Sequence, residues 1–177
     1  MTTMPSRRSQ PPLALSVPLS RFTSRVGGGS AFFVRRNDTF YKNHAMKTWL
    51  KLIGSQEHPI TGGYTGEHIG FRRAGRPSIR IGDHLFLYAP GGSRRIFALA
   101  EVVSDPERDP DYKPNEHGSC QWRLSVSYLR NMPVASGILL DDIMSGERDL
   151  RLSLRQASHV RLLASESELA YRKLPEH

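Results

Sequence analysis

The sequence predicts an α+β domain in which a mixed, mainly antiparallel β-sheet curls toward a barrel and short helices flank it. Three observations predict this class. A clear β-hairpin lies near the middle of the chain, most apolar runs are short and separated by Gly- and Pro-rich segments, and long helical crossovers are missing. Because parallel strands need such crossovers, a doubly wound parallel sheet is disfavoured. The 177 residues suffice for one domain of ordinary size and a tail.

The tail is predicted at the N-terminus. Residues 1–29 are rich in Pro, Ser, Arg and Gly and read as a disordered basic arm, whereas residues 30–175 form the domain. The formal charge is +8, but residues 1–36 hold six arginines and no acidic residue, which leaves 19 basic and 17 acidic residues elsewhere. The excess positive charge therefore lies mainly in the arm. It can attract phosphates without sequence preference, or simply keep the chain in solution.

The composition also limits the chemistry and the compartment. Cys120 is the single cysteine, so no disulfide can form within the chain, and a reducing, cytoplasmic location is expected. No run approaches the roughly 20 apolar residues that span a bilayer. The seven histidines show no metal-binding spacing. We expect no cofactor, no catalytic residue, no membrane association and a monomer.

The first elements of the domain are a strand and a helix. Residues 30–34, Ser-Ala-Phe-Phe-Val, form an apolar run suited to a buried strand. A helix is expected next, from a cap at Asn37 or Asp38 to a stop at Gly54. The residues at helical spacing within it are Tyr41, Ala45, Thr48, Trp49 and Leu52. Residues 55–78 look irregular, apart from a short strand around 68–72.

The β-hairpin is the strongest local pattern. Residues 84–89 (HLFLYA) and 95–103 (RIFALAEVV) read as its strands, with Pro90-Gly91-Gly92-Ser93 as the turn. After a polar loop, residues 121–128 alternate between apolar and polar positions, as a half-buried strand does.

The C-terminal part alternates between short helices and one strand. Residues 136–145 are predicted as a short helix or turn, residues 150–156 as a helix, and residues 159–164 (HVRLLA) as a strand. Ser165 and Glu168 have the spacing of a capping box, which predicts a final helix from there to about Leu174.

The order of these segments resembles a known superfamily. Gly82-Asp83, the apolar strand after it, and Ala100-Glu101-Val102-Val103 with Pro106 resemble the centre of EVE domains and related PUA-like domains, which include the YTH and ASCH domains. Phe32-Phe33-Val34 resembles the opening of EVE and YTH domains, and the match extends over residues 31–174. The chain departs from EVE domains in lacking Asn-Pro after the first strand. It also has Phe71 near the position where a tryptophan is common.

The resemblance implies a PUA-like barrel that binds a nucleobase flipped out of its stack. The expected function is recognition of a modified, methylated base in DNA or RNA. A flat apolar wall contributes about 1–3 kcal/mol per stacked base, and a few fixed donors and acceptors read the base edge. An aromatic cage adds selectivity for a methyl group because the group fills it.

Candidate site residues follow from this expectation, and each has a structural interpretation beside the functional one. Trp49, Phe71 and Tyr88 are the candidate pocket walls, or else core residues. Asn37 and Asp38 would bond the base edge, or else cap the helix. The candidate phosphate contacts, which could equally be solvated surface, are Arg35, Arg36, Arg72, Arg73, Arg94 and Arg95.

Two alternatives stay open. An ASCH-like ribonuclease or modified-nucleoside hydrolase would carry a Gly-x-Lys-x-x-Glu segment, but residues 74–80 contain neither the lysine nor the glutamate, and Glu101 is the residue whose change would test it. A protein-interaction module would have its pocket filled by its own side chains. An open cleft beside Trp49, Phe71 and Tyr88 would favour the base reader.

Overall fold

The described part of the chain is organised by a β-hairpin and by one parallel pairing of strands. The structure is a computed structural model, and it describes residues 45–55, 57–114, 116 and 118–176. These residues belong to one unit that spans residues 43–177. The predicted arm, the strand at 30–34 and the candidates Arg35, Arg36, Asn37 and Asp38 lie outside the described residues.

The main sheet has the order β2-β6-β4-β3-β1-β8. Its strands are β1 (Thr48–Leu52), β2 (His68–Phe71), β3 (His84–Ala89), β4 (Arg95–Val102), β6 (Trp122–Asn131) and β8 (His159–Arg161). β1 runs parallel to β3 and the other pairings are antiparallel. Two short strands pair at its sides, β5 (Glu107–Arg108) with β6 and β7 (Ile138–Leu139) with β4.

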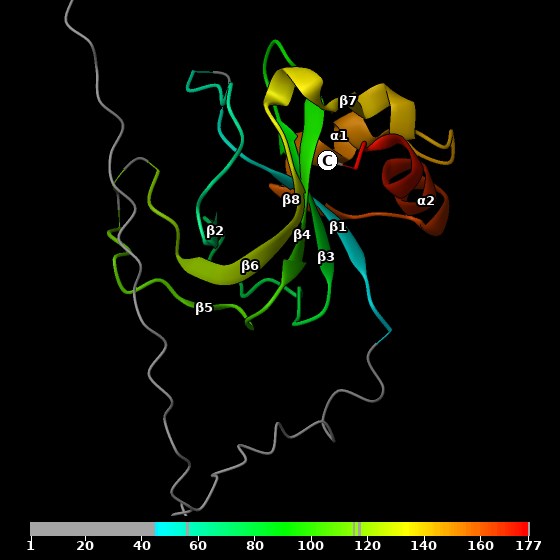
Figure 1. The fold of residues 1–177 in the computed structure, drawn as a ribbon. Helices are drawn as coiled ribbons and strands as arrows, with labels where there is room; N and C mark the ends of the chain where they lie inside the picture. The colour runs from blue at the N-terminus through cyan, green and yellow to red at the C-terminus, as the bar shows by residue number, and fades with distance from the viewer. Residues whose placement is uncertain (1–44, 56, 115, 117, 177) are drawn as a thin grey trace, which may run out of the picture. The chain divides into compact units, whose positions relative to one another are not determined.

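The sheet is strongly curled, as predicted. β6 bends away from β4 toward β2 and β5, and the helices lie on the other side of β3 and β4 (Figure 1). The helices are α1 (Leu150–Gln156) and α2 (Ala164–Lys173), with two 3-10 turns, η2 (Val134–Ser136) and η3 (Leu140–Ile143). A curled mixed sheet with flanking short helices is the α+β architecture that the sequence predicts.

The hairpin and α1 agree with their sequence signals, whereas β8 ends three residues before the predicted end at Ala164, and the predicted short helix or turn at 136–145 contains the strand β7. β3 and β4 pair through a turn in which Gly91 has φ 87°, a conformation that glycine adopts without steric cost. α1 occupies the predicted residues because the Asp149 carboxylate accepts the backbone N–H groups of Arg151 and Leu152. β6 begins as predicted and extends three residues further, to Asn131.

The predicted helix that ends at Gly54 is wrong over residues 48–52, which form β1. Four of its five residues are buried, because β1 pairs with β3 on one side and β8 on the other. A strand buried on both faces shows no alternation, and the set Tyr41, Ala45, Thr48 and Leu52, whose members are three or four residues apart, imitates a helix. Trp49 is therefore a strand residue.

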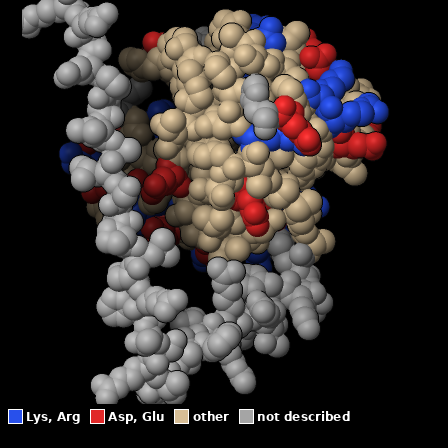
Figure 2. Space-filling view, viewed as in Figure 1, with Lys and Arg blue, Asp and Glu red and all other residues tan. Residues whose placement is uncertain are grey.

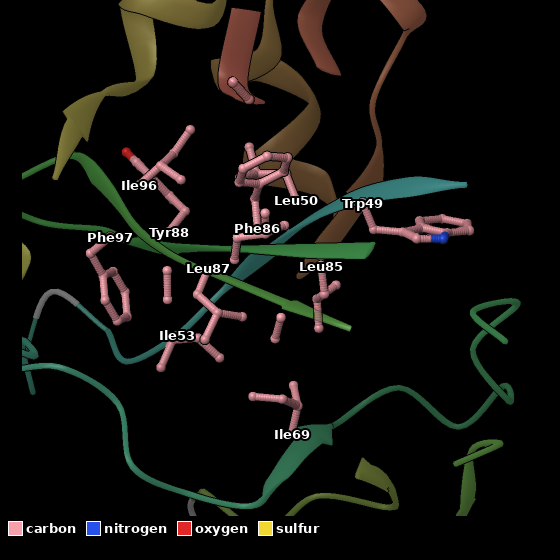
Figure 3. Close-up of a cluster of buried hydrophobic side chains, with 14 of the residues drawn as sticks. Trp49, Leu50, Ile53, Ile69, Leu85, Phe86, Leu87, Tyr88, Ile96 and Phe97 are labelled. Carbon is pink, nitrogen blue, oxygen red and sulfur yellow. The ribbon is translucent and has the colours of Figure 1, made fainter. Parts of the chain in front are cut away.

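The sheet buries side chains on both faces. Residues paired across neighbouring strands share a face, so Trp49 and Leu85 project to the inside of the curl, whereas Leu50 and Phe86 project to the helix side. Figure 3 shows these two sets on opposite sides of the strands. On the helix side, the Tyr171 ring of α2 lies 5.1 Å from the Phe86 ring.

α2 is attached by a buried carboxylate that the sequence pattern misplaced. The predicted box used Glu168, but the Glu166 carboxylate accepts the Leu163 backbone N–H at 2.8 Å, three residues before it. Glu166 is fully buried. Arg148 donates to both of its carboxylate oxygens, at 2.9 and 2.6 Å. Glu166 rather than Glu168 caps α2 because it stands three residues after Leu163 and is also paired with Arg148.

We predict that Glu166→Ala lowers the free energy of unfolding by about 3 kcal/mol, since it leaves the Arg148 guanidinium without its carboxylate. Urea denaturation of the full chain measures the change. Glu168→Ala is the matched control, because Glu168 is exposed, and a change within about 0.5 kcal/mol is expected. Equal effects of the two substitutions would contradict the assignment.

Candidate functional site

The curl of the sheet brings its two end strands together. β2 and β8 stand at opposite ends of the strand order, yet the Phe71 ring of β2 meets the His159 ring of β8 edge-on, with centroids 5.2 Å apart. The contact is made by side chains, and β2 takes its strand hydrogen bonds from β6. This junction is the seam of the curled sheet.

Four side chains meet at the seam, and we call them the seam cluster: Trp49, Lys51, Phe71 and His159. Lys51 is paired with His159 across β1 and β8, so the two project from the same face. The His159 ring lies 5.9 Å from the Trp49 ring. The Lys51 ammonium lies 4.8 Å from the centre of the Phe71 ring, in a cation–π contact.

Lys51 is the unusual member of the cluster. It is 6% exposed, and within the described part of the chain it makes no hydrogen bond or ion pair. Burial lowers the pKa of Lys51 to about 8, and nearby Arg72 lowers it further while Cys120 opposes the shift. Every fully sealed side-chain nitrogen or oxygen among these residues has a partner. The unpaired Nζ atom therefore retains contact with solvent.

His159 is a neutral ring at physiological pH. Burial lowers the pKa of His159 to about 4, and the charges of Lys51 and Arg73 act in the same direction. The imidazole thus offers one donor and one acceptor nitrogen without adding charge. It is a flat heteroaromatic ring in contact with both aromatic walls of the seam.

The two aromatic walls are held in place by the fold. The Trp49 indole N–H donates to the Asp83 carboxylate at 2.9 Å, and Asp83 is fully buried. Trp49 is 7% and Phe71 1% exposed. The site as seen is closed, with the His159 ring against both walls.

Tyr88 lies apart from the other two candidate walls. Its register partner is Leu52, which places it on the helix side of the sheet with Phe86, as Figure 3 shows. It lines a separate cavity between the hairpin turn and α1. The structure thus brings Trp49 and Phe71 together and does not bring Tyr88 to them.

Of the four described arginine candidates, two lie at the seam and two do not. Arg72 and Arg73 are exposed and directly follow β2 at the seam, and Arg73 donates to the Gln156 carbonyl just before β8. Arg94 is exposed at the hairpin turn. Arg95 is used by the fold, since it donates to the Gly137 carbonyl.

Charge elsewhere on the domain is mixed. On the face shown in Figure 2, basic and acidic side chains are interspersed over the α2 side and the centre is largely uncharged. A cleft of about 830 Å³ lies beside β2. Its charged lining residues are Asp109, Asp111, Lys113, Glu116 and Arg123. A cleft with more acidic than basic groups does not suit a phosphate backbone.

Glu101, the residue that would test the hydrolase alternative, does not lie at the seam. Glu101 is paired with His84 on the helix side of the sheet, away from Lys51. Within the described residues, no group of three or more His, Cys, Asp or Glu side chains is arranged to hold a metal ion. Nor does any helix there have the length and apolar character needed to cross a membrane.

Sequence reasoning missed Lys51 and His159. A single lysine inside an apolar run, Thr-Trp-Leu-Lys-Leu, is the available signal for Lys51, because lysine is rarely buried without a partner. No local pattern marks His159, whose position opposite Lys51 depends on the pairing of β1 with β8.

Comparisons with known proteins found similar folds only. No family model and no curated protein matches the sequence. An NMR structure of a protein from Rhodopseudomonas palustris is 15% identical, with a TM-score of 0.48, over 72% of this chain and 92% of that one. A crystal structure from Agrobacterium tumefaciens is 18% identical, with a TM-score of 0.45, over 73% and 99%.

An ASCH protein from Zymomonas mobilis is 10% identical, with a TM-score of 0.42, over 73% of this chain and 97% of that one. At such identities, function does not transfer between proteins of one fold. We therefore argue function from the residues of this chain.

Proposed function

We propose that this protein is a nucleic-acid-binding module that receives one flipped base at the seam cluster. The observation that carries the proposal is Lys51, a buried ammonium without an ion-pair partner among the described residues. Withdrawing most of the water around a charge is costly, and an anionic or strongly polar ligand at the seam would offset that cost. The neighbouring aromatic rings suit a planar ligand.

The surroundings of Lys51 favour a nucleotide over other anions. Arg72 and Arg73 are exposed at the end of β2 and can contact the phosphates that flank the base. Trp49 and Phe71 offer stacking surface, which contributes about 1–3 kcal/mol per base. The Lys51 ammonium can donate to a carbonyl oxygen on the base edge.

The base would take the place of the His159 ring. His159 already presents a neutral heteroaromatic ring to Trp49 and Phe71, so a base of similar flatness can make the same contacts once the imidazole moves aside. A methyl group on the base adds apolar contact with these walls, and we propose that the ligand is a modified base in DNA or RNA. The lone Cys120 thiol is free, in keeping with a proposed cytoplasmic site of action.

A hydrolase of the ASCH-like kind is the second candidate, and one observation favours it. An amine whose pKa is lowered to about 8 can accept a proton near neutral pH. Glu101, the acid considered from the sequence, lies on the other face of the sheet. Binding without turnover would favour the module over the enzyme.

The test is a binding screen of the full chain with short single-stranded oligonucleotides that carry either unmodified or methylated cytosine or adenine. Measurements at two salt concentrations separate phosphate attraction, which weakens with salt, from base recognition, which does not. We expect tighter binding to one modified base at both salt concentrations. Equal affinity for all oligonucleotides would overturn the reader proposal, and product formation would favour the hydrolase.

We predict that His159→Ala tightens binding of the preferred oligonucleotide about five- to tenfold, which corresponds to about 1 kcal/mol, because the base no longer displaces the imidazole. Fluorescence anisotropy measures the affinity. His58→Ala is the control, since His58 is exposed and does not belong to the seam cluster, and no change is expected. Weaker binding by a folded His159→Ala protein would mean that the imidazole contacts the ligand. If wild type and His159→Ala both fail to bind every oligonucleotide, the closed seam would indicate a protein-interaction module instead.

A further inference from the structure

The cavity between the β3–β4 turn and α1 carries features of a second ligand site. It has a volume of about 230 Å³ and is lined by Tyr88, Arg94, Asp141, Arg151, Leu154 and Arg155, among others. Leu154 and Arg155 stand three and four residues after Arg151, so both lie beside it on the helix surface. We call this space the hairpin cavity. It lies on the helix side of the sheet, opposite the seam cluster.

The charges around the hairpin cavity do not balance. Arg151 is paired with Asp141, to which its Nε atom donates at 3.1 Å. Arg94 and Arg155 make no ion pair or hydrogen bond through their guanidinium groups within the described residues. Three guanidinium groups against one carboxylate leave two positive charges at the rim.

Tyr88 adds an uncharged hydrogen-bonding group to the lining of the hairpin cavity. Its side chain is 6% exposed, it lines the cavity, and its hydroxyl makes no hydrogen bond in the described part of the chain. Burial raises the pKa of Tyr88, with Arg94 acting against the shift, so the hydroxyl keeps its proton and can donate. Because every fully sealed side-chain oxygen among the described residues has a partner, this unpaired hydroxyl retains contact with solvent, and a ligand in the cavity can accept its hydrogen bond.

Arg94 also has an unusual backbone. Its φ of 46° is the one positive φ of a non-glycine residue among those described, and such a conformation costs about 1 kcal/mol or more. The Leu140 N–H donates to the Arg94 carbonyl at 3.1 Å, which fixes the turn over the cavity. Glycine would suit this backbone better, so the arginine side chain is the feature to explain.

We propose that the hairpin cavity binds the phosphate of a small phosphate monoester. Two net positive charges match a monoester, which carries about −1.5 to −2 at neutral pH, better than a diester with its single charge. Planar guanidinium groups bind phosphate oxygens in pairs, and the Tyr88 hydroxyl donates to a third oxygen. The apolar lining, including Leu154, contacts the carbon part of the ligand. This site does not depend on the function proposed for the seam.

The test is calorimetric titration of the full chain with four probes: inorganic phosphate, a nucleoside 5′-monophosphate, the same nucleoside without phosphate, and a single-stranded oligonucleotide without terminal phosphates. We expect the monophosphate to bind and the nucleoside not to bind. Arg155→Gln should weaken monophosphate binding about tenfold. Arg172→Gln, at an exposed arginine of α2, should leave it unchanged.

Arg94→Gly is a second variant, and its effect on binding cannot be attributed to unfolding. It should raise the melting temperature, because glycine relieves the backbone conformation, and still weaken monophosphate binding about tenfold. The proposal is overturned if neither phosphate probe binds, or if the monophosphate binds the wild type and both variants alike. Oligonucleotide binding that Arg155→Gln weakens as much as it weakens monophosphate binding would overturn the assignment to monoesters, because binding at the seam cluster does not involve Arg155.

Discussion

Lys51→Met is expected to make the full chain more stable and to abolish its binding to nucleic acid. Methionine fills nearly the same space beside Phe71 and makes favourable sulfur–aromatic contacts, but it carries no charge into the seam. The pKa of Lys51 falls from 10.5 to about 8 on burial. Each pKa unit corresponds to about 1.4 kcal/mol, so the gain at pH 7 is about 3 kcal/mol.

The gain from Lys51→Met should depend on pH in a defined direction. Below pH 8, both the folded and the unfolded wild type hold the Lys51 proton, and the full cost of burying the charge is present. Between pH 8 and 10.5 the folded state releases the proton while the unfolded state keeps it, so wild-type stability rises with pH. The difference between the two proteins should therefore shrink over this interval and vanish above it.

Urea denaturation at pH 7, 9 and 10.5 measures this difference, and anisotropy at pH 7 measures the loss of binding. Lys173→Met is the matched control, because Lys173 lies on α2 with a side chain that is 40% exposed. It should change stability by less than about 1 kcal/mol and leave binding intact. A Lys51→Met protein that is less stable at pH 7, or that binds as tightly as wild type, would contradict the role assigned to Lys51.

Local signals predicted the parts of the fold that local interactions determine. The β3–β4 hairpin has a glycine turn between two apolar strands, and α1 has an aspartate cap, so each is encoded within a few residues. β1 was mistaken for a helix because its conformation depends on β3 and β8. The long-range pairing overrides the helix-like spacing of the residues before and within β1.

The candidate site was likewise predicted only in part. Trp49 and Phe71 were predicted as walls of one pocket, and both lie at the seam, although Tyr88 does not. Lys51 and His159 could not be predicted as neighbours, since only the antiparallel register of β1 and β8 places them side by side. Contacts between side chains that depend on strand register cannot be predicted from local sequence patterns.

The Gly82-Asp83 motif, on which the resemblance to PUA-like domains largely depends, has a structural explanation. Gly82 adopts φ 82° in the turn before β3, and its N–H donates to the Val102 carbonyl. The buried Asp83 carboxylate accepts the backbone N–H groups of Lys47 and Arg80 and the Trp49 indole N–H, at 2.9, 3.0 and 2.9 Å. The motif thus fixes the start of β1 and β3 and one wall of the seam.

Asp83→Ala is accordingly expected to lower the free energy of unfolding by about 4 kcal/mol, because each buried donor left without an acceptor costs about 1–3 kcal/mol. That is a large share of the 5–15 kcal/mol typical of a domain, so the variant should unfold at a markedly lower temperature than wild type, as measured by circular dichroism. Asp83→Asn retains one carbonyl oxygen and should lose about half as much.

A double-mutant cycle of Asp83→Ala with Trp49→Phe isolates the indole bond, since alanine removes the acceptor and phenylalanine removes the donor but keeps an aromatic ring. A coupling energy of about 1.5–3 kcal/mol is expected for a hydrogen bond to a charged acceptor. If the two substitutions are additive, the indole bond does not hold Trp49. The Trp49→Phe protein should still bind nucleic acid, more weakly, because the wall remains aromatic while its orientation is no longer fixed by Asp83.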